Sequence, residues 1–158
     1  MEVKPPAEPV VRAAGLLTPG RALDLACGSG RHAIWLYQHG WQVTAVDHNT
    51  EAIRQLRVAH PEIDSRVVDL EANSAVLTPT AYELIVCWLY HQDDLYPMIR
   101  AAIRPGGIVV LAALLDGRFA AQPAELRAHF AGWTILYDAP CVTVSTRSTC
   151  EIIARFDP

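Results

Sequence analysis

Lysine is nearly absent from this chain of 158 residues. Lys4 is the only lysine, and the other 12 residues of the lysine-plus-arginine total of 13 are arginines. Because Lys4 lies in the N-terminal tail, we expect no Schiff-base lysine, no lysine of a Walker-type phosphate loop and no tyrosine–lysine pair of the kind found in reductases. The basic residues do not cluster and the net charge is −4, so we expect no nucleic-acid partner.

Long apolar runs are absent as well. The longest, residues 108–115, is far too short to span a bilayer, and residues 1–6 lack an apolar run of the signal-peptide type. The cysteines show no CxxC spacing, which is typical of reduced thiols. We therefore expect a cytoplasmic protein with no membrane partner. The cysteines are Cys27, Cys87, Cys141 and Cys150.

The histidines do not pair with cysteines or acids at ligand spacing, so we expect scattered histidines and no metal site. The composition is globular, with 51% hydrophobic and 19% charged residues. The length predicts a single domain over residues 1–158, in which a short N-terminal segment, residues 1–20, precedes a core over residues 21–158. The histidines are His32, His39, His48, His60, His91 and His129.

The rest of the chain is organised around residues 22–30. A short apolar run ends there in a glycine-rich turn, and residues 31–38 then follow a helical pattern. Gly28 and Gly30 let the backbone pass close to a ligand, and the start of the helix offers free N–H groups. Asp24 lies inside the apolar strand, where burial of a carboxylate is unfavourable unless the group has a partner or a function. This stretch is typical of a nucleotide-binding site.

Asp47 ends the second expected strand, residues 41–46, and lies 19 residues after Gly28. In βαβ nucleotide folds, an acid about 20 residues after the glycines accepts hydrogen bonds from ribose hydroxyls. The alternative is an ordinary aspartate in a surface turn. Because Asp47 and the glycine turn occur together at this spacing, the ribose role is favoured.

Helical and strand patterns alternate along the rest of the chain, which predicts an α/β fold with a mostly parallel sheet. Residues 108–115 are the most hydrophobic strand and are expected in the middle of the sheet. The last two strands are joined by residues 139–149 without a helix, so we expect an antiparallel pair. The expected helices cover residues 10–17, 31–38, 49–60, 92–104 and 124–130, the expected strands cover residues 22–26, 41–46, 65–68, 82–88, 108–115, 133–137 and 150–156, and a loop covers residues 72–80.

On these residues, the chain resembles the class I S-adenosylmethionine-dependent methyltransferases over residues 21–156. The runs DLACGSGRHAIWL and LYH are similar to those of small bacterial enzymes of the tellurite-resistance type. Ala26 replaces the first glycine of the usual motif, which we expect to be harmless. The resemblance implies a Rossmann-like, mostly parallel sheet of seven strands, with helices on both faces and a closing antiparallel pair. The matching elements are residues 24–30, 46–47, 68–71 and 104–107.

The resemblance also implies a cofactor, S-adenosyl-L-methionine, with S-adenosyl-L-homocysteine as its product. Asp24 would fix the glycine loop and the amino group of the cofactor, and Asp47 would bind both ribose hydroxyls. Asp69 would accept a hydrogen bond from the exocyclic amine of adenine. The other implied cofactor-binding residues are Ala26, Cys27, Gly28, Ser29 and Gly30 through the loop backbone, His48 along the adenine edge, Leu70 through its N–H, and Cys87 and Trp88 near the amino group and the methyl.

The acceptor is expected to be a small molecule. Methyl transfer is an in-line displacement, so the protein supplies alignment and excludes water, and a general base is needed only if the acceptor must lose a proton. His91 is the best candidate to line the acceptor site, with Tyr90 and His32 behind it. Alternatively, His91 belongs to a helix cap region and His32 is a solvated residue of a first helical turn. Arg31 beside His32 would favour an anionic acceptor.

Two other functions remain open from the sequence. Residues 28–33 formally match the dinucleotide fingerprint of an NAD(P)-dependent oxidoreductase. Asp24 and the lack of a second domain for hydride chemistry argue against it. The short N-terminal segment and the lack of long insertions favour an intact cofactor half and an ill-defined acceptor half. The other alternative is therefore a cofactor-binding domain that is non-catalytic or that depends on a partner, and a homodimer is one such arrangement.

Overall fold

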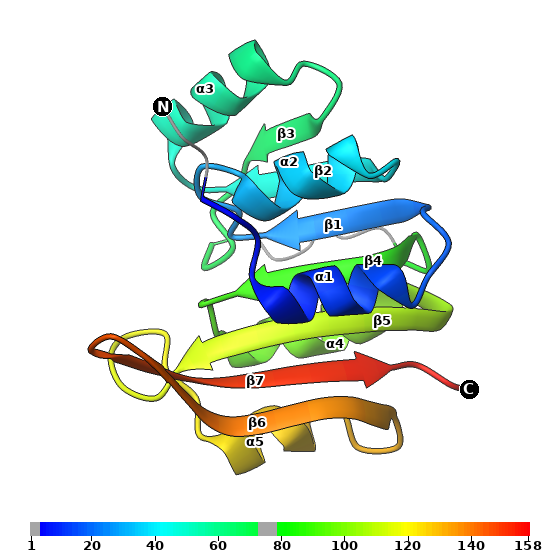
Figure 1. The fold of residues 1–158 in the computed structure, drawn as a ribbon, viewed down its shortest axis with the longest axis vertical. Helices are drawn as coiled ribbons and strands as arrows, with labels where there is room; N and C mark the ends of the chain where they lie inside the picture. The colour runs from blue at the N-terminus through cyan, green and yellow to red at the C-terminus, as the bar shows by residue number, and fades with distance from the viewer. Residues whose placement is uncertain (1–3, 73–78) are drawn as a thin grey trace.

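A mixed sheet of seven strands forms the centre of the computed structural model, which describes residues 4–72 and 79–158 (Figure 1). The strand order is β3-β2-β1-β4-β5-β7-β6. The first five strands pair in parallel, and β7 runs antiparallel between β5 and β6. The predicted fold class is therefore confirmed. The strands are β1 (Arg21–Leu25), β2 (Gln42–Asp47), β3 (Asp64–Val67), β4 (Tyr82–Trp88), β5 (Ile103–Leu114), β6 (Thr134–Val144) and β7 (Arg147–Arg155).

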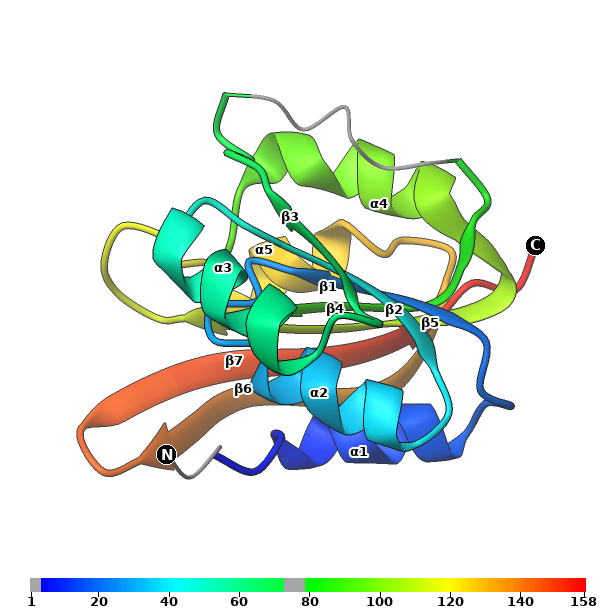
Figure 2. The ribbon, with the colours of Figure 1, turned by 90° about the horizontal axis from the view of Figure 1, so that it is seen from above.

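Helices cover both faces of the sheet (Figure 2). One face carries α1, α2 and α3, and the other carries α4 and α5, so each face has its own apolar core. No helix in the described ranges is long and apolar enough to cross a membrane. The helices are α1 (Glu8–Gly15), α2 (Arg31–Gln38), α3 (Thr50–Ala59), α4 (Tyr96–Ala102) and α5 (Pro123–Ala128), with a short 3-10 turn, η1 (Asp93–Leu95), before α4.

The two cores explain why the central strands are so apolar. Val10 of α1 and Leu36 of α2 pack into one core, and Ile99 of α4 and Leu126 of α5 pack into the other. β4 and β5 lie between these cores and are buried on both faces along most of their length. The central position expected for residues 108–115 is therefore confirmed.

Around the glycine turn, the helix boundaries and caps are those that the sequence predicts. α2 begins at Arg31, directly after Gly30, and has the predicted bounds. The Asn49 side chain accepts a hydrogen bond from the N–H of Ala52 at 3.0 Å, which caps α3. β2 ends at Asp47 beside β1. The turn after β1 and the end of β2 are therefore neighbours at one edge of the sheet.

The helix predicted over residues 92–104 is shorter in the structure. The segment starts as η1, continues as α4 and enters β5 at Ile103, which pairs with Tyr82. Pro97 lies in the first turn of α4, where its missing N–H is not needed. The prediction is wrong at its far end because helical periodicity does not report the long-range pairing of Ile103 with the sheet.

The connection predicted over residues 139–149 is wrong. β6 and β7 pair along most of this segment, and only residues 145–146 form the turn. Pro140 hides the strand pattern in the sequence. In the structure, Pro140 lies at an irregularity in the pairing of β6, which is an edge strand and so tolerates proline. The result is a hairpin much longer than expected.

The N-terminal helix also differs from its prediction over residues 10–17. It begins earlier, at Glu8, and packs on the sheet against β5 and β7 (Figure 1). The loop predicted over residues 72–80 falls mainly on residues 73–78, which lie outside the described ranges.

Candidate functional site

Two pockets lie where β1, β2 and β4 end, with volumes of about 240 Å³ and about 710 Å³. They share Ala26, Trp88 and Leu89, which form a common wall. The first pocket is otherwise lined by Asp47, His48, Val68, Asp69, Leu70, Glu71, Tyr90, Arg118 and Phe119. The second is otherwise lined by Lys4, Cys27, Gly28, Ser29, Arg31, His32, Ile34, Ala52, Gln55, Leu56, Ala59, His60 and Arg147. Most of the predicted cofactor-binding residues thus line one pocket or the other, whereas Asp24, Gly30 and Cys87 line neither.

The turn between β1 and α2 depends on left-handed backbone conformations. Ala26, Gly28 and Gly30 have φ angles of 52°, 57° and 89°. Glycine adopts this region freely, whereas alanine is strained there by about 1–2 kcal/mol. Ala26 stands where the usual motif has glycine, and this replacement was expected to be harmless. In the structure it places backbone strain in the wall between the pockets. The N–H of Cys27 donates to the carbonyl of Val46 at 3.0 Å, which ties the turn to β2.

Asp47 is buried at the carboxyl end of β2 and holds two backbone groups. Its Oδ2 accepts from the N–H of Gly28 at 2.9 Å, and its Oδ1 accepts from the N–H of Asn49 at 2.8 Å. A carboxylate offers about four lone-pair positions, so each oxygen can accept a further hydrogen bond. Asp47 lines the first pocket and can therefore receive two neighbouring hydroxyls. His48 follows it as an exposed residue of the same pocket.

Asp24 lies in β1 directly before the turn and is 1% exposed. Its Oδ2 has no hydrogen-bond partner among the residues that the structure describes. Burial raises the pKa of Asp24 to about 7; a backbone hydrogen bond from Ala33 opposes this rise, and the charge of Asp47 adds to it. A buried carboxylate with an unpaired oxygen is a strong site for a positively charged group.

The turn geometry makes Gly30→Ala destabilising. A β-carbon at Gly30 would lie 2.9 Å from Cδ1 of Leu56, and φ there is +89°. We expect the free energy of unfolding to fall by about 1–3 kcal/mol, measured by urea denaturation, because alanine is strained at this φ and Leu56 must move. Gly15→Ala is the control, since no atom lies within 4 Å of its β-carbon. Wild-type stability for Gly30→Ala would contradict this account of the turn.

Asp69 and Leu70 follow β3 and line the first pocket. Asp69 Oδ1 accepts from the N–H of Glu71 at 3.0 Å. The Gln92 side chain donates to the carbonyl of Leu70 at 2.9 Å. These contacts hold the segment after β3 against the loop after β4, so that both contribute to one wall.

Arg118 and Phe119, which follow β5, line the first pocket and were not predicted. Arg118 forms an ion pair with Glu71 at 2.8 Å, and the Phe119 ring lies with its centroid 4.6 Å from that of Tyr90. No motif marks these two residues. The only available signal is their position after a parallel strand, since ligands bind at the carboxyl ends of such strands.

Basic side chains gather at the second pocket. Lys4 comes from the N-terminal segment, Arg31 from the start of α2 and Arg147 from the start of β7. No aspartate or glutamate is among the described residues that line this pocket. Arg147 was missed because the long hairpin was missed. The pocket therefore offers a positive environment, which favours an anion.

His32 lines the second pocket and is buried, so the alternative of a solvated residue is wrong. Its Nε2 accepts from the N–H of Ala7 at 3.1 Å, and its ring meets Trp88 edge-on with centroids 5.8 Å apart. Burial lowers the pKa of His32 to about 4, and the charge of Arg31 adds to this effect. His32 is thus neutral at pH 7 and holds the N-terminal segment beside the pocket.

Cys87 and His91 do not line either pocket. The Cys87 thiol is buried and donates to the carbonyl of Tyr90 at 3.4 Å, and burial raises the pKa of this thiol. His91 Nδ1 lies 2.9 Å from the hydroxyl of Tyr96, and its Nε2 lies 3.1 Å from Glu125 Oε1. The geometry therefore does not support the acceptor role expected of His91, whereas Tyr90 does line the first pocket.

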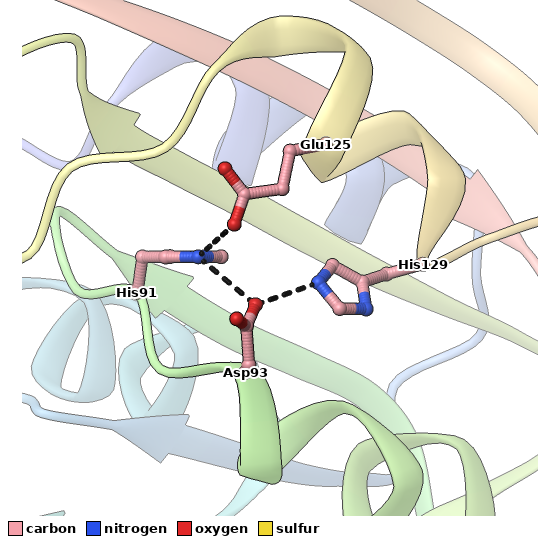
Figure 3. A group of neighbouring side chains, drawn as sticks. All are labelled: His91, Asp93, Glu125 and His129. Carbon is pink, nitrogen blue, oxygen red and sulfur yellow. Dashed lines mark hydrogen bonds and ion pairs between the residues drawn. The ribbon is translucent and has the colours of Figure 1, made fainter.

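The expectation of scattered histidines is wrong for His91 and His129. They lie with Asp93 and Glu125 in one cluster, in which one ligand atom from each residue lies within 4.8 Å of the others (Figure 3). Part of the signal was available, because Glu125 and His129 are four residues apart on a predicted helix and so share a face. Their approach to His91 and Asp93 depends on the fold.

Comparison with known proteins agrees with this geometry. The family model described as "Tellurite resistance protein TehB" matches residues 2–141. The crystal structure of TehB from Haemophilus influenzae has a TM-score of 0.80 at 22% identity, covering 94% of this chain and 61% of that chain. The protein named "Probable S-adenosyl-L-methionine-dependent methyltransferase TehB" from the same species is 46% identical over 44 residues, which are 28% of this chain and 15% of that protein.

Longer alignments join the chain to two other relatives. Hemagglutinin 1 of Eikenella corrodens is 29% identical over 138 residues, which cover 76% of this chain and 46% of that protein. The ubiquinone biosynthesis O-methyltransferase of Xanthomonas campestris pv. campestris is 32% identical over 112 residues, which cover 65% of this chain and 46% of that protein. The chain thus spans about half the length of these relatives. The resemblance expected from the sequence is confirmed, and the chain belongs to the TehB family of class I S-adenosylmethionine-dependent methyltransferases.

Proposed function

We propose that this chain transfers a methyl group from S-adenosyl-L-methionine to a small anionic molecule. The observation that carries the proposal is Asp24, a buried carboxylate with one unpartnered oxygen directly before the glycine turn. The cofactor has a positively charged amino group, and such a group would neutralise this carboxylate. The family to which the chain belongs supports the same cofactor.

The residues of the two pockets fit the other parts of the cofactor. Asp47 would accept from both ribose hydroxyls, and Asp69 and Leu70 would hold the adenine in the first pocket, with His48 along its edge. The backbone of residues 26–30 would hold the methionine part, and Trp88 in the shared wall would lie beside it. When bound, S-adenosyl-L-methionine supplies a methyl group on a sulfonium, activated for displacement. The protein's part is to align the two reactants and to exclude water.

The charges of the second pocket favour an anionic acceptor. Lys4, Arg31 and Arg147 line it, and the carboxylate of the cofactor would need only part of this positive charge. Burial raises the pKa of Tyr90 to about 12 and lowers that of His32 to about 4, so neither is an effective general base near pH 7. We therefore expect an acceptor that is already deprotonated, such as an oxyanion or a thiolate.

Two alternatives have less support. Hydride transfer from a nicotinamide would leave the Asp24 carboxylate without a partner, and the Xanthomonas campestris relative is named as a methyltransferase. A non-catalytic or partner-dependent domain remains an outcome of the test below, because the chain spans about half the length of its relatives. The proposal also includes a reducing, cytoplasmic location, since all four cysteines are free thiols.

The test is a calorimetric titration of the purified chain with S-adenosyl-L-homocysteine, with NADH titrated in parallel. We expect one molecule of S-adenosyl-L-homocysteine to bind per chain and NADH not to bind. Binding of NADH alone, or of neither compound, would contradict the proposed cofactor. If the cofactor binds, release of S-adenosyl-L-homocysteine in the presence of oxyanions or thiols identifies the acceptor. Turnover that appears only with neutral acceptors would refute the anionic class.

A further inference from the structure

Two histidines and two carboxylates form a cluster outside both pockets (Figure 3). His91 and Asp93 come from the segment after β4, where the chain turns through η1. Glu125 lies in α5, and His129 ends that helix. The fold thus brings together four side chains of the types that can ligate a metal, from two segments that are far apart in the sequence. Hereafter these four residues are called the His91 cluster.

The distances within the His91 cluster suit a single bound cation. His91 Nε2 lies 3.1 Å from Glu125 Oε1 and 3.3 Å from Asp93 Oδ1. His129 Nε2 lies 3.1 Å from the same oxygen of Asp93. A tetrahedral Zn²⁺ with bonds of about 2.0–2.1 Å holds its ligand atoms about 3.3 Å apart. These three pairs already have that spacing, and all the ligand atoms lie within 4.8 Å of one another.

Neighbouring groups hold the side chains of the cluster in place. His91 Nδ1 lies 2.9 Å from the hydroxyl of Tyr96, and the His91 side chain is only 8% exposed. Metal-bound histidines commonly use their second nitrogen in this way, which leaves Nε2 for the metal. The His129 ring stacks on the same tyrosine with centroids 3.7 Å apart. Glu125 Oε2 accepts from the N–H of Gln122 at 3.3 Å, so its other oxygen faces the cluster.

The donor set of the cluster also suits a cation. Both histidines present Nε2 to carboxylate oxygens, and a bound cation would take the lone pairs of these nitrogens together with those of the carboxylates. Two carboxylates balance the charge of a divalent cation, and imidazole with carboxylate is a ligand set of Zn²⁺ and of neighbouring first-row metals. We propose that the His91 cluster binds one divalent first-row transition cation. The competing arrangement needs no metal, because each Nε2 then carries a proton and donates it to a carboxylate.

A cation at this site would act through the loop that it fastens. Tyr90 precedes His91 and lines the first pocket, and Gln92 holds the carbonyl of Leu70 in the same wall. The cation would join this loop to α5 and so hold one wall of the pocket in place. Its role is therefore structural, and the inference does not depend on which cofactor the pocket binds.

The test is to treat the full chain with a chelator and then to measure Zn²⁺ binding, both by calorimetric titration and by the change in the melting temperature Tm. We expect one Zn²⁺ per chain and a higher Tm in its presence. His91→Gln and His129→Gln should each weaken Zn²⁺ binding at least about 100-fold. Tyr96→Phe keeps the ring and removes only the hydroxyl beside His91, so it should weaken binding about 10–100-fold. Simple ion pairs would not give this metal-dependent pattern.

The matched control is His39→Gln, which removes an exposed histidine outside the cluster and should leave Zn²⁺ binding unchanged. Co²⁺ serves as a second probe, because thiolate ligands such as the exposed Cys141 would add sulfur-to-metal charge-transfer bands. If a histidine variant fails to fold, Glu125→Gln is tested in its place, because it keeps the length of the side chain. The proposal is overturned by the absence of stoichiometric binding, by unchanged affinity in the cluster variants, or by thiolate bands.

Discussion

Asp24→Asn is expected to stabilise the ligand-free protein at pH 8 and, at the same time, to abolish tight binding of S-adenosyl-L-homocysteine. Asp24 is 1% exposed, and one of its oxygens has no partner among the described residues. Asparagine has nearly the same shape without the charge, so its burial is less unfavourable. It also lacks the charge that would attract the amino group of the ligand. Stability and binding therefore change in opposite directions.

The sign and size of the stability effect follow from the pKa. The pKa of Asp24 is about 7 in the folded protein, against an ordinary value of 3.8. Because the folded state holds this proton more tightly, the group makes the free energy of unfolding fall as pH rises from about 4 to about 7. The fall is at most about 4 kcal/mol. Asp24→Asn lacks this pH-dependent fall. Urea denaturation at several pH values should therefore give unfolding free energies for the wild type and the variant that diverge as pH rises.

The ligand provides the second readout. In the wild type, affinity for S-adenosyl-L-homocysteine should fall as pH drops below about 7, at most about tenfold per pH unit, because the Asp24 carboxylate must then lose a proton to bind. Asp64→Asn is the control, since Asp64 is an exposed aspartate paired with Arg66 on β3. Parallel stability curves for wild type and Asp24→Asn would contradict the pKa, and unchanged binding would contradict the role of the carboxylate.

Asp47→Ala is expected to weaken binding of S-adenosyl-L-homocysteine by about 100-fold or more. A hydrogen bond to a charged group contributes about 1.5–3 kcal/mol, and two ribose hydroxyls would lose such a bond. The substitution also removes the acceptor for the N–H of Gly28, so the glycine turn keeps only the bond from Cys27 to Val46 of the two described ties to β2. Calorimetric titration at pH 8 measures the loss. Wild-type affinity would falsify the ribose role.

Asp47→Asn separates charge from size at the same position. Both carboxylate oxygens accept from backbone N–H groups, those of Gly28 and Asn49. The NH₂ group of an asparagine would have to face one of these donors, and two donors do not bond. We therefore expect a loss of affinity close to that of Asp47→Ala, although the side chain has nearly its original volume. Asp64→Ala should leave the affinity unchanged.

The part of the site around β1 and β2 was predictable because its signals are local. The glycine turn, the start of α2 and the cap at Asn49 each depend on residues within a few positions of one another. The spacing from Gly28 to Asp47 reflects one βαβ unit of ordinary length. Parallel pairing then places these residues at one edge of the sheet without further information.

The rest of the site depends on contacts that the sequence does not display. Arg118, in the segment after β5, reaches Glu71, in the segment after β3, although these two strands are not neighbours in the sheet. Arg147 reaches the second pocket through a hairpin whose pattern is broken by Pro140. The His91 cluster forms because α5 packs beside the segment after β4, and its members are unremarkable when read singly. Sequence periodicity reports such contacts poorly.

The place of β7 in the sheet has a consequence for synthesis of the chain. β7 is the last strand described, yet it lies between β5 and β6, and α1 packs against β5 and β7. A chain that leaves the ribosome from its N-terminus therefore holds β5 with an unpaired edge, and α1 without part of its packing surface, until residues 147–155 emerge. An uncovered edge of this kind invites pairing with other chains. Nascent chains arrested before this strand are thus expected to aggregate more readily than the complete fold.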